Sequence, residues 1–232
     1  MLTLQLLGRF CFCIDGRPRQ LGPALQRLTA LLAVHSWSSR YVIAGMLWPD
    51  HGEDAALAAL RTAVWRLQHR TPGVLDVGTH TLTLSSGVAV DLSECVRWAQ
   101  RLLRNPGAVA DDDLDPPAET ADLLPGWDDE WLEPERQRVH QLHVHALETA
   151  ANEQLARGRP GPALATAFTA LRNDQLRESA HRLVVRIHLA EGNVDAALRQ
   201  FRACRELLDA ELGVTPSPAL AELVEPYLGR AR

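Results

Sequence analysis

The sequence contains no lysine, so all 24 of its basic residues are arginine. Aromatic residues make up only 5% of the chain, and its four cysteines are scattered, without the paired spacing of a metal site. This pattern argues against a disulfide framework and for a reducing compartment. No apolar run approaches the roughly 20 residues of a membrane-spanning helix, and the apolar stretch after Met1 is too short for a signal peptide. We therefore expect a cytoplasmic protein that does not associate with a membrane.

The motifs of catalysis are also missing. The sequence has no phosphate-binding loop, no nucleophile motif and no pair of carboxylates in a pocket-like pattern. His140, His143 and His145 resemble part of a metal site, but no carboxylate or cysteine completes the set, so a solvent-exposed helix face is their expected setting. We therefore expect no enzyme, no catalytic residue, no metal and no cofactor.

Charge is distributed unevenly along the chain. The formal net charge of −5 does not by itself suggest a nucleic-acid partner. Residues 1–95 hold 8 Arg against 7 acidic residues, whereas residues 96–232 hold 16 Arg against 22. The local pattern is sharper, because no acidic residue occurs from Ala55 to Leu75 while three Arg and one His do. A DNA-binding surface needs local positive potential, so this segment favours contact with DNA.

The first 35 residues predict two strands followed by a helix. Leu2 to Leu6 and Phe10 to Ile14 alternate in the manner of strands, and Asp15-Gly16 is a turn signal. Gly22-Pro23 then starts a helix, because proline suits the first helical position.

Residues 39–70 predict two helices joined by a turn. Ser38-Ser39 can cap the first, and Pro49 and Gly52 separate it from the second. In the second helix Leu57, Leu60, Val64 and Leu67 recur at spacings of 3, 4 and 3, which defines a core face. The opposite face, with its flanks, holds Ala58, Arg61, Thr62, Trp65, Arg66, His69 and Arg70. Two helices joined in this way, the second with a basic face, are typical of a helix-turn-helix that binds in a DNA groove.

The next segment supports this interpretation. Residues 74–90 alternate apolar and small polar residues around glycines, as the hairpin wing of a winged helix does. Thr79, His80 and Thr81 fall at the expected tip of the wing. They could contact the DNA backbone, and a plain solvated turn explains them equally well.

Beyond residue 91 the chain is predicted to be helical. Residues 92–104 and 130–157 are expected helices, and residues 105–117, rich in Pro, Gly and Asp, are an expected exposed loop. Leu155-Ala156-Arg157-Gly158 and Leu189-Ala190-Glu191-Gly192 then align at an offset of 34 residues, the period of tetratricopeptide helical hairpins. Such repeats stack into a surface suited to protein partners.

These patterns together predict a mainly α protein with a small β component. Residues 1–93 are expected to form a winged helix-turn-helix. Residues 94–232 are expected to form an all-α, tetratricopeptide-like helical domain.

Several motifs resemble one known family. Residues 47–50 (LWPD) and 60–67 (LRTAVWRL) resemble the winged-helix domain of the Streptomyces antibiotic regulatory protein (SARP) family. Residues 123–132 (LLPGWDDEWL), 176–182 (LRESAHR), 188–193 (HLAEGN) and 211–217 (ELGVTPS) resemble its bacterial transcriptional activation domain. The resemblance covers nearly the whole chain.

This resemblance implies a sequence-specific transcriptional activator of a secondary-metabolite, often antibiotic, gene cluster. Members of the family typically bind promoter direct repeats as double-stranded DNA and recruit RNA polymerase through its sigma factor or other subunits. The second helix of residues 39–70 would enter the major groove and the hairpin would touch the minor groove. The expected location is the bacterial cytoplasm at the nucleoid, with self-association on DNA as a further expectation.

Nine residues are the expected DNA contacts. Arg66 is the expected base reader, with Thr62 and His69 beside it, because arginine can donate two hydrogen bonds to a guanine edge. Contacts to phosphates are expected from Arg40, Arg61 and Arg70. Trp65 is expected to pack on the wing, with a place at the DNA surface as the alternative. His80 and Thr81 complete the set.

One alternative function stays open at this point. A protein-interaction adaptor whose winged helix has lost its DNA affinity would also fit the weak charge of residues 1–95. Salt dependence separates the two hypotheses, because phosphate contacts make affinity fall steeply as salt rises.

Overall fold

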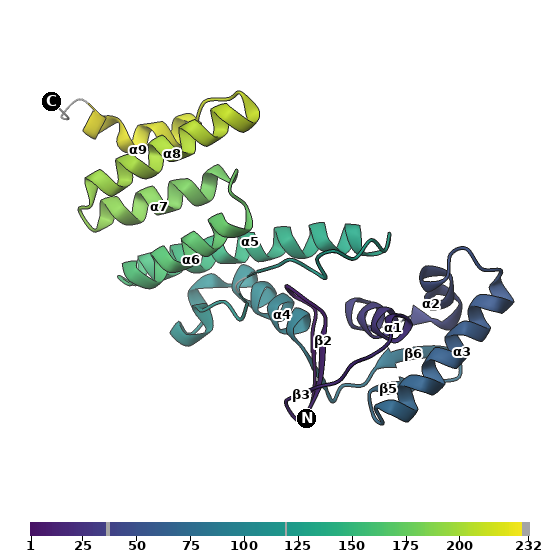
Figure 1. Cartoon of the computed structure of the whole chain (residues 1–232). Coiled ribbons are helices and arrows are strands. Elements are labelled where there is room, and N and C mark those ends of the chain that lie inside the picture. Colours follow the sequence, from purple (N-terminus) through teal and green to yellow (C-terminus); the bar gives the residue numbers. More distant parts are fainter. Residues whose placement is uncertain (36–37, 119, 229–232) are drawn as a thin grey trace. The chain divides into compact units, whose positions relative to one another are not determined.

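The computed structural model describes residues 1–35, 38–118 and 120–228 (Figure 1). The chain is mainly helical with two small sheets, as predicted. Its contacts divide it into two compact units. The first unit comprises Met1–Cys95 and Ala121–Val139, and the second comprises Val96–Thr120 and His140–Arg232. No helix within the described ranges has the length and apolar character needed to cross a membrane.

The first sheet of the first unit has the strand order β3-β2-β1-β7. Strands β1 (Leu2–Gln5) and β2 (Cys11–Ile14) confirm the two predicted strands. They pair antiparallel, and the turn after β2 places both Asp15 and Gly16 at positive φ. The edge strand β3 (Arg17–Pro18) follows this turn.

Strand β7 (Val88–Val90) departs from the predicted hairpin. The sequence pattern extended the hairpin to residue 90, but β7 pairs in parallel with β1 in the first sheet. Val88 and Val90 are buried there. The hairpin itself consists of β5 (Leu75–Val77) and β6 (Thr81–Leu84) alone. The expectation for residues 74–90 was therefore wrong at its C-terminal end, because burial against a strand distant in sequence decides the pairing of β7.

Between β3 and β7, the first unit also contains three helices and a second sheet. The helices are α1 (Pro23–Val34), α2 (Arg40–Leu47) and α3 (Glu53–Arg70). Pro23 opens α1 as predicted, and the Oγ of Ser39 caps α2 by accepting a hydrogen bond from the Val42 amide at 3.3 Å. The second sheet has the order β4-β6-β5, in which β4 is the two-residue strand Ser38–Ser39.

Residues 121–139 pack within the first unit through main-chain contacts. The amide of Gly8 donates to the carbonyl of Asp122 at 2.7 Å, and the amide of Leu124 donates to Leu6 at 2.9 Å. The ring of Trp127 stacks on Phe10 with centroids 5.7 Å apart.

The side chain of Asp91 links the residues that follow β1 to the start of the helix that follows β7. Asp91 is the first residue of α4 (Asp91–Arg104), and its side chain accepts hydrogen bonds from the amides of Leu6 and Leu7 at 2.8–3.1 Å. Burial raises the pKa of Asp91, while these amide donors oppose that rise.

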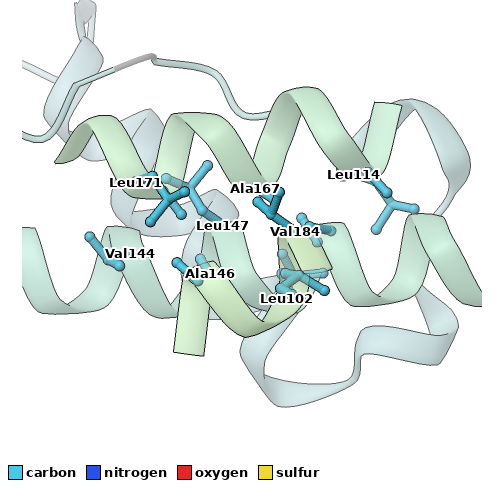
Figure 2. Packing of buried hydrophobic residues seen from close by; sticks show 14 of the residues in the cluster. Leu102, Leu114, Val144, Ala146, Leu147, Ala167, Leu171 and Val184 are labelled. Atoms are coloured by element: carbon cyan, nitrogen blue, oxygen red, sulfur yellow. The ribbon is translucent and has the colours of Figure 1, made fainter. Parts of the chain in front are cut away.

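The second unit is built from helices packed on an apolar cluster. It contains most of α4 and α5 (Leu132–Ala156), together with α6 (Pro160–Asn173), α7 (Glu178–Ala190), α8 (Val194–Leu212) and α9 (Pro218–Leu228). Figure 2 shows Leu102, Leu147, Ala167 and Val184, from four different helices, gathered in one cluster. Many members of the cluster are alanines, which let helices approach closely.

The loop expected at residues 105–117 is more ordered than its composition suggested. It contains two short 3-10 helices, η1 (Pro106–Ala108) and η2 (Asp111–Leu114). Leu114 is fully buried in the apolar cluster, and the Nε1 of Trp98 donates to the carbonyl of Asp113 at 2.9 Å. The prediction of a wholly exposed loop was therefore wrong, because one leucine attaches the loop to the core.

The 34-residue repeat is visible in matching turns. Gly158 and Gly192 both adopt positive φ, 71° and 75°. The amide of Arg159 donates to Gln154 at 2.9 Å, and the amide of Asn193 donates to His188 at 2.8 Å, so the same hydrogen bond recurs 34 residues later. Ala163 and Ala197, also 34 apart, are both fully buried. The first turn connects α5 to α6 and the second connects α7 to α8 (Figure 1).

The three histidines of α5 do not share one environment. His145 is exposed, but His143 is fully buried, its ring 6.0 Å from that of Trp98. Burial lowers the pKa of His143 from 6.5 to about 4, with a smaller contribution from His140. The predicted solvent-exposed helix face was therefore wrong for His143. Across the described residues, no group of three or more His, Cys, Asp or Glu side chains is arranged to hold a metal ion.

Candidate nucleic-acid interface

Helix α3 has one buried and one exposed face, as its periodicity predicted. Its inward residues are Ala56, Leu60, Ala63, Val64 and Leu67, all buried. The six α3 residues expected to contact DNA are all exposed: Arg61, Thr62, Trp65, Arg66, His69 and Arg70. The amphipathic pattern therefore places all six on the solvent side of one helix. We call this set the α3 face.

The three arginines of the α3 face are free of ion pairs. Among the residues that the structure describes, no carboxylate lies within ion-pair distance of Arg61, Arg66 or Arg70. The acidic residues of α3, Glu53 and Asp54, lie in its first turn, where they suit the helix dipole. The positive charge of the face is therefore available to an external anion.

The rings of Trp65 and His69 form a close, tilted pair on the surface. Trp65 is 59% exposed, its ring centroid lies 4.1 Å from that of His69, and the Nδ1 of His69 lies 2.8 Å from the carbonyl oxygen of Trp65. Residues four apart on a helix are neighbours on one face, which explains the contact. The expectation that Trp65 packs on the wing was wrong, because its position on α3 points outward.

Thr62 is tied to its own helix. Its Oγ1 donates to the carbonyl of Ala58 at 3.0 Å, so the hydroxyl hydrogen is used while the oxygen can still accept a hydrogen bond. The side chain is therefore oriented and exposed.

A shallow groove of about 790 Å³ runs beside the α3 face. One wall comes from α3, and the other comes from the start of α1 and from Trp48. Its lining residues are Gly22, Pro23, Ala24, Leu25, Trp48, Ala59, Thr62, Ala63, Trp65, Arg66, His69 and Arg70. The sequence identified Pro23 as a helix start but gave no signal that this start lies beside α3, since that contact depends on tertiary packing.

Arg40, His80 and Thr81 come together at the hairpin turn. The amide of Gly78 donates to the carbonyl of Thr81 at 3.0 Å, which closes the turn. The amide of Arg40 donates to His80 at 3.2 Å, and its Nη2 donates to the carbonyl of Gly78 at 3.2 Å. Arg40 therefore holds the turn in place, a role that the sequence did not predict. His80 and Thr81 are exposed.

A side chain at Gly78 would displace the Thr81 side chain across the turn. A Cβ at this position would lie 2.5 Å from the Oγ1 of Thr81, closer than real Cβ contacts allow. The turn is therefore tight, and it presents His80 and Thr81 on a defined backbone.

Comparison with known proteins finds similarity to transcriptional regulators in both sequence and fold. The profile of the bacterial transcriptional activator domain matches residues 118–226. The chain is also 30% identical over 242 residues to the regulatory protein AfsR of Streptomyces coelicolor. That alignment covers 98% of this chain but only 24% of AfsR, so the chain spans about a quarter of this curated relative.

A solved structure shares the fold. Mycobacterium tuberculosis EmbR, determined in complex with a low-affinity phosphopeptide, matches with a TM-score of 0.73 over 99% of this chain and 65% of that chain. The sequence identity is 20%, so this likeness concerns the fold alone.

These matches agree with the resemblance predicted from the motifs. Residues 118–226 match a bacterial transcriptional activator domain, and the chain is similar in sequence to part of a regulatory protein.

Proposed function

We propose that this chain is a transcriptional activator of the SARP family and that it binds double-stranded DNA sequence-specifically through the α3 face. Residues 1–93 would act as its winged-helix DNA-binding domain, and residues 94–232 as its activation domain of tetratricopeptide-like repeats. The observation that carries the proposal is the α3 face itself: three exposed arginines without a carboxylate partner among the described residues, on a segment free of acidic residues from 55 to 75. An unpaired cationic helix face of this kind suits a major groove.

Each part of the face has a distinct proposed role. Arg66 lies centrally and reads a base edge, where a bidentate contact to guanine contributes about 1–3 kcal/mol of discrimination. Thr62 and His69 lie beside it, and Arg61 and Arg70 contact phosphates on its flanks. The Trp65 ring is 59% exposed and lies against His69, which supports a place for Trp65 at the DNA surface.

The hairpin turn supplies a second contact. His80 and Thr81 are exposed on a turn that Arg40 braces, so we assign them to the sugar-phosphate backbone. The Nη2 of Arg40 is already bonded to the carbonyl of Gly78. We assign the expected phosphate contact of Arg40 to the other nitrogens of its guanidinium.

We assign transcriptional activation to the second unit. The activator domain would recruit RNA polymerase, through its sigma factor or another subunit, to promoters of a secondary-metabolite gene cluster. Binding to direct repeats would place copies of the chain side by side on DNA, in the bacterial cytoplasm at the nucleoid. The similarity to AfsR, whose name describes a regulatory protein, supports this assignment.

Selection from a random pool of duplex DNA tests the DNA-binding proposal. The purified chain should enrich one motif at moderate salt, and Arg66→Ala should lose preference at one or two base positions of it. Arg199→Ala is the matched control, because Arg199 is an exposed helical arginine of the second unit paired with Asp195. An unaltered motif in the Arg66→Ala variant would contradict the reading role, and no enrichment by the wild type would contradict the proposal.

Run-off transcription tests activation separately. With purified polymerase holoenzyme and a promoter carrying the selected motif, the chain should raise transcript yield several-fold over a promoter with a scrambled motif. Tight binding without any increase would reject polymerase recruitment while leaving DNA binding intact.

A protein-interaction adaptor is the second candidate, favoured by the net charge of only +1 over residues 1–95. An adaptor would show little DNA binding even at low salt. Nanomolar binding at low salt that weakens as salt is added would reject the adaptor.

A further inference from the structure

Strand β2 carries two cysteines that the proposed DNA-binding function does not use. Phe12 points into the core and is 1% exposed, so its neighbours Cys11 and Cys13 lie on the opposite face of the strand, where both are half-buried. Both are free thiols, and their Sγ atoms are 3.6 Å apart. Since β1 and β3 pair with β2 on its two edges, the backbone beneath the thiols is supported on both sides.

The distance between the sulfurs indicates what they can bind. A disulfide would require roughly 2.05 Å and a shorter approach of the two Cβ atoms than side chains on one face of a strand allow. An ion held linearly by two sulfurs at about 2.3 Å each would need roughly 4.6 Å. One atom bonded to both at about 2.3 Å with a near-tetrahedral angle needs roughly 3.8 Å. The observed 3.6 Å fits this last arrangement.

We propose that Cys11 and Cys13 form a two-thiol site that binds monosubstituted arsenic(III) compounds, with one arsenic atom bridging the two sulfurs. In the reaction with an organoarsenic(III) oxide, both S–H bonds break and two As–S bonds form. The oxygen leaves arsenic and takes up both protons as water. Arsenic and sulfur keep their oxidation states, so the step requires no oxidant or reductant.

The ligand count favours arsenic over zinc. Protein zinc sites use three or four protein ligands, whereas the described part of the chain offers no third His, Cys, Asp or Glu for this site. A monosubstituted arsenic(III) centre needs only two sulfurs to complete its bonding.

The protonation state agrees with this preference. Burial, together with the hydrogen bond to Cys13, raises the pKa of Cys11, which keeps this thiol protonated near neutral pH. The arsenic oxide takes up the thiol protons as water, so the reaction does not require a pre-formed thiolate at Cys11.

The chain contains its own controls. Cys95 and Cys204 are buried, 2% and 0% exposed. Burial raises the pKa of each of these thiols to about 11. Neither is expected to react with a small thiophilic probe.

Phenylarsine oxide added to the intact chain tests the site. Native mass spectrometry should show one arsenic adduct per chain, thiol titration should show the loss of two thiols, and peptide mapping should place the adduct on the peptide with Cys11 and Cys13. Cys11→Ser and Cys13→Ser should each weaken binding at least about 100-fold, because a chelate gains from the high effective concentration of its second ligand. Cys204→Ser should bind as the wild type does, and excess ethanedithiol should release the arsenic.

Three results would overturn the proposal. These are an adduct that maps to Cys95 or Cys204, wild-type affinity in either single serine variant, and one bound zinc ion per chain without an arsenic adduct. Mapping on the unsubstituted chain requires no variant, so a variant that fails to fold would not obscure the answer.

Discussion

The arginines of α3 and those of the second unit are the same residue in two different settings. In the second unit Arg157 pairs with Asp111 at 2.6 Å, Arg177 pairs with Glu148 at 2.9 Å, and Arg186 donates to Asn152 at 2.9 Å. On α3, within the described chain, Arg61, Arg66 and Arg70 have no such partner. These three arginines connect separate elements of the second unit, whereas α3 presents its arginines to solvent.

This difference would let a chain of net charge −5 bind DNA as we propose. A paired guanidinium contributes little to the external potential, because its carboxylate neutralises it within a few ångströms. Unpaired arginines that share one helix face with no acidic residue nearby concentrate positive potential there. The proposed nucleic-acid face therefore rests on where the α3 arginines lie, not on how many arginines the chain has.

The largest effect is expected when all three α3 arginines are removed together. Arg61→Ala/Arg66→Ala/Arg70→Ala should weaken binding to the selected DNA about 1,000-fold, roughly 4 kcal/mol, as one base contact and two phosphate contacts are lost. Fluorescence anisotropy at fixed salt measures the loss. Because these side chains are exposed and unpaired, the thermal midpoint should hardly move, and a large fall in that midpoint would show that they are structural.

His143 of the second unit contrasts with the exposed, charged arginines of α3, because its burial keeps the imidazole neutral. Its pKa of about 4 lies below the usual 6.5. Between these pH values His143 is therefore protonated in the unfolded chain and neutral in the folded chain, which favours unfolding. Its effect on stability is absent above pH 6.5 and grows as pH falls toward 4, where it reaches roughly 3 kcal/mol.

Urea unfolding from pH 7 to pH 4 measures this loss. His143→Gln cannot take up a proton, so its stability should depend less on pH across the same window. An identical pH dependence in the two proteins would contradict a buried neutral histidine.

A smaller effect is expected from Arg177→Ala. The Arg177 and Glu148 side chains are only 15% and 13% exposed, and Ser179 also donates to Glu148. Removing the arginine leaves the Glu148 charge half-desolvated, which should lower the free energy of unfolding by about 2 kcal/mol. DNA affinity of the folded protein should not change, and a double-mutant cycle with Glu148→Gln isolates the pair.

The smallest effect is expected from Arg199→Ala. Arg199 pairs with Asp195 one turn earlier on α8, but both side chains are largely exposed. Exposed pairs of this kind contribute at most about 0.5 kcal/mol. A loss above 1 kcal/mol in urea unfolding, or any loss of DNA affinity, would contradict the proposed difference between paired and unpaired arginines.

The sequence predicted local features well, since they depend on periodicity. The two faces of α3, the Ser39 cap and the glycine turns of the repeat all follow from residues within one or two helical turns. Features that depend on contacts distant in the chain were missed. Strand β7 pairs with β1, Leu114 fills the core of the second unit, and His143 is buried against Trp98, 45 positions earlier.

The same limit applies to the candidate site. Exposure of the six α3 residues could be predicted, but the orientation of Trp65, the bracing role of Arg40 and the groove wall from the start of α1 could not. These depend on how α1, α2 and the hairpin pack around α3. Periodicity indicates which residues face outward but not what lies beside them.

The salt dependence of DNA binding tests the central claim most directly. For the wild type and the triple α3 arginine variant, the logarithm of the association constant is plotted against the logarithm of salt concentration. Each phosphate contact contributes a slope of about −0.9, so loss of the two phosphate contacts of Arg61 and Arg70 should make the slope of the variant shallower by roughly 1.8. Equal slopes for the two proteins, or a wild-type affinity that ignores salt, would contradict the claim that the α3 face binds DNA.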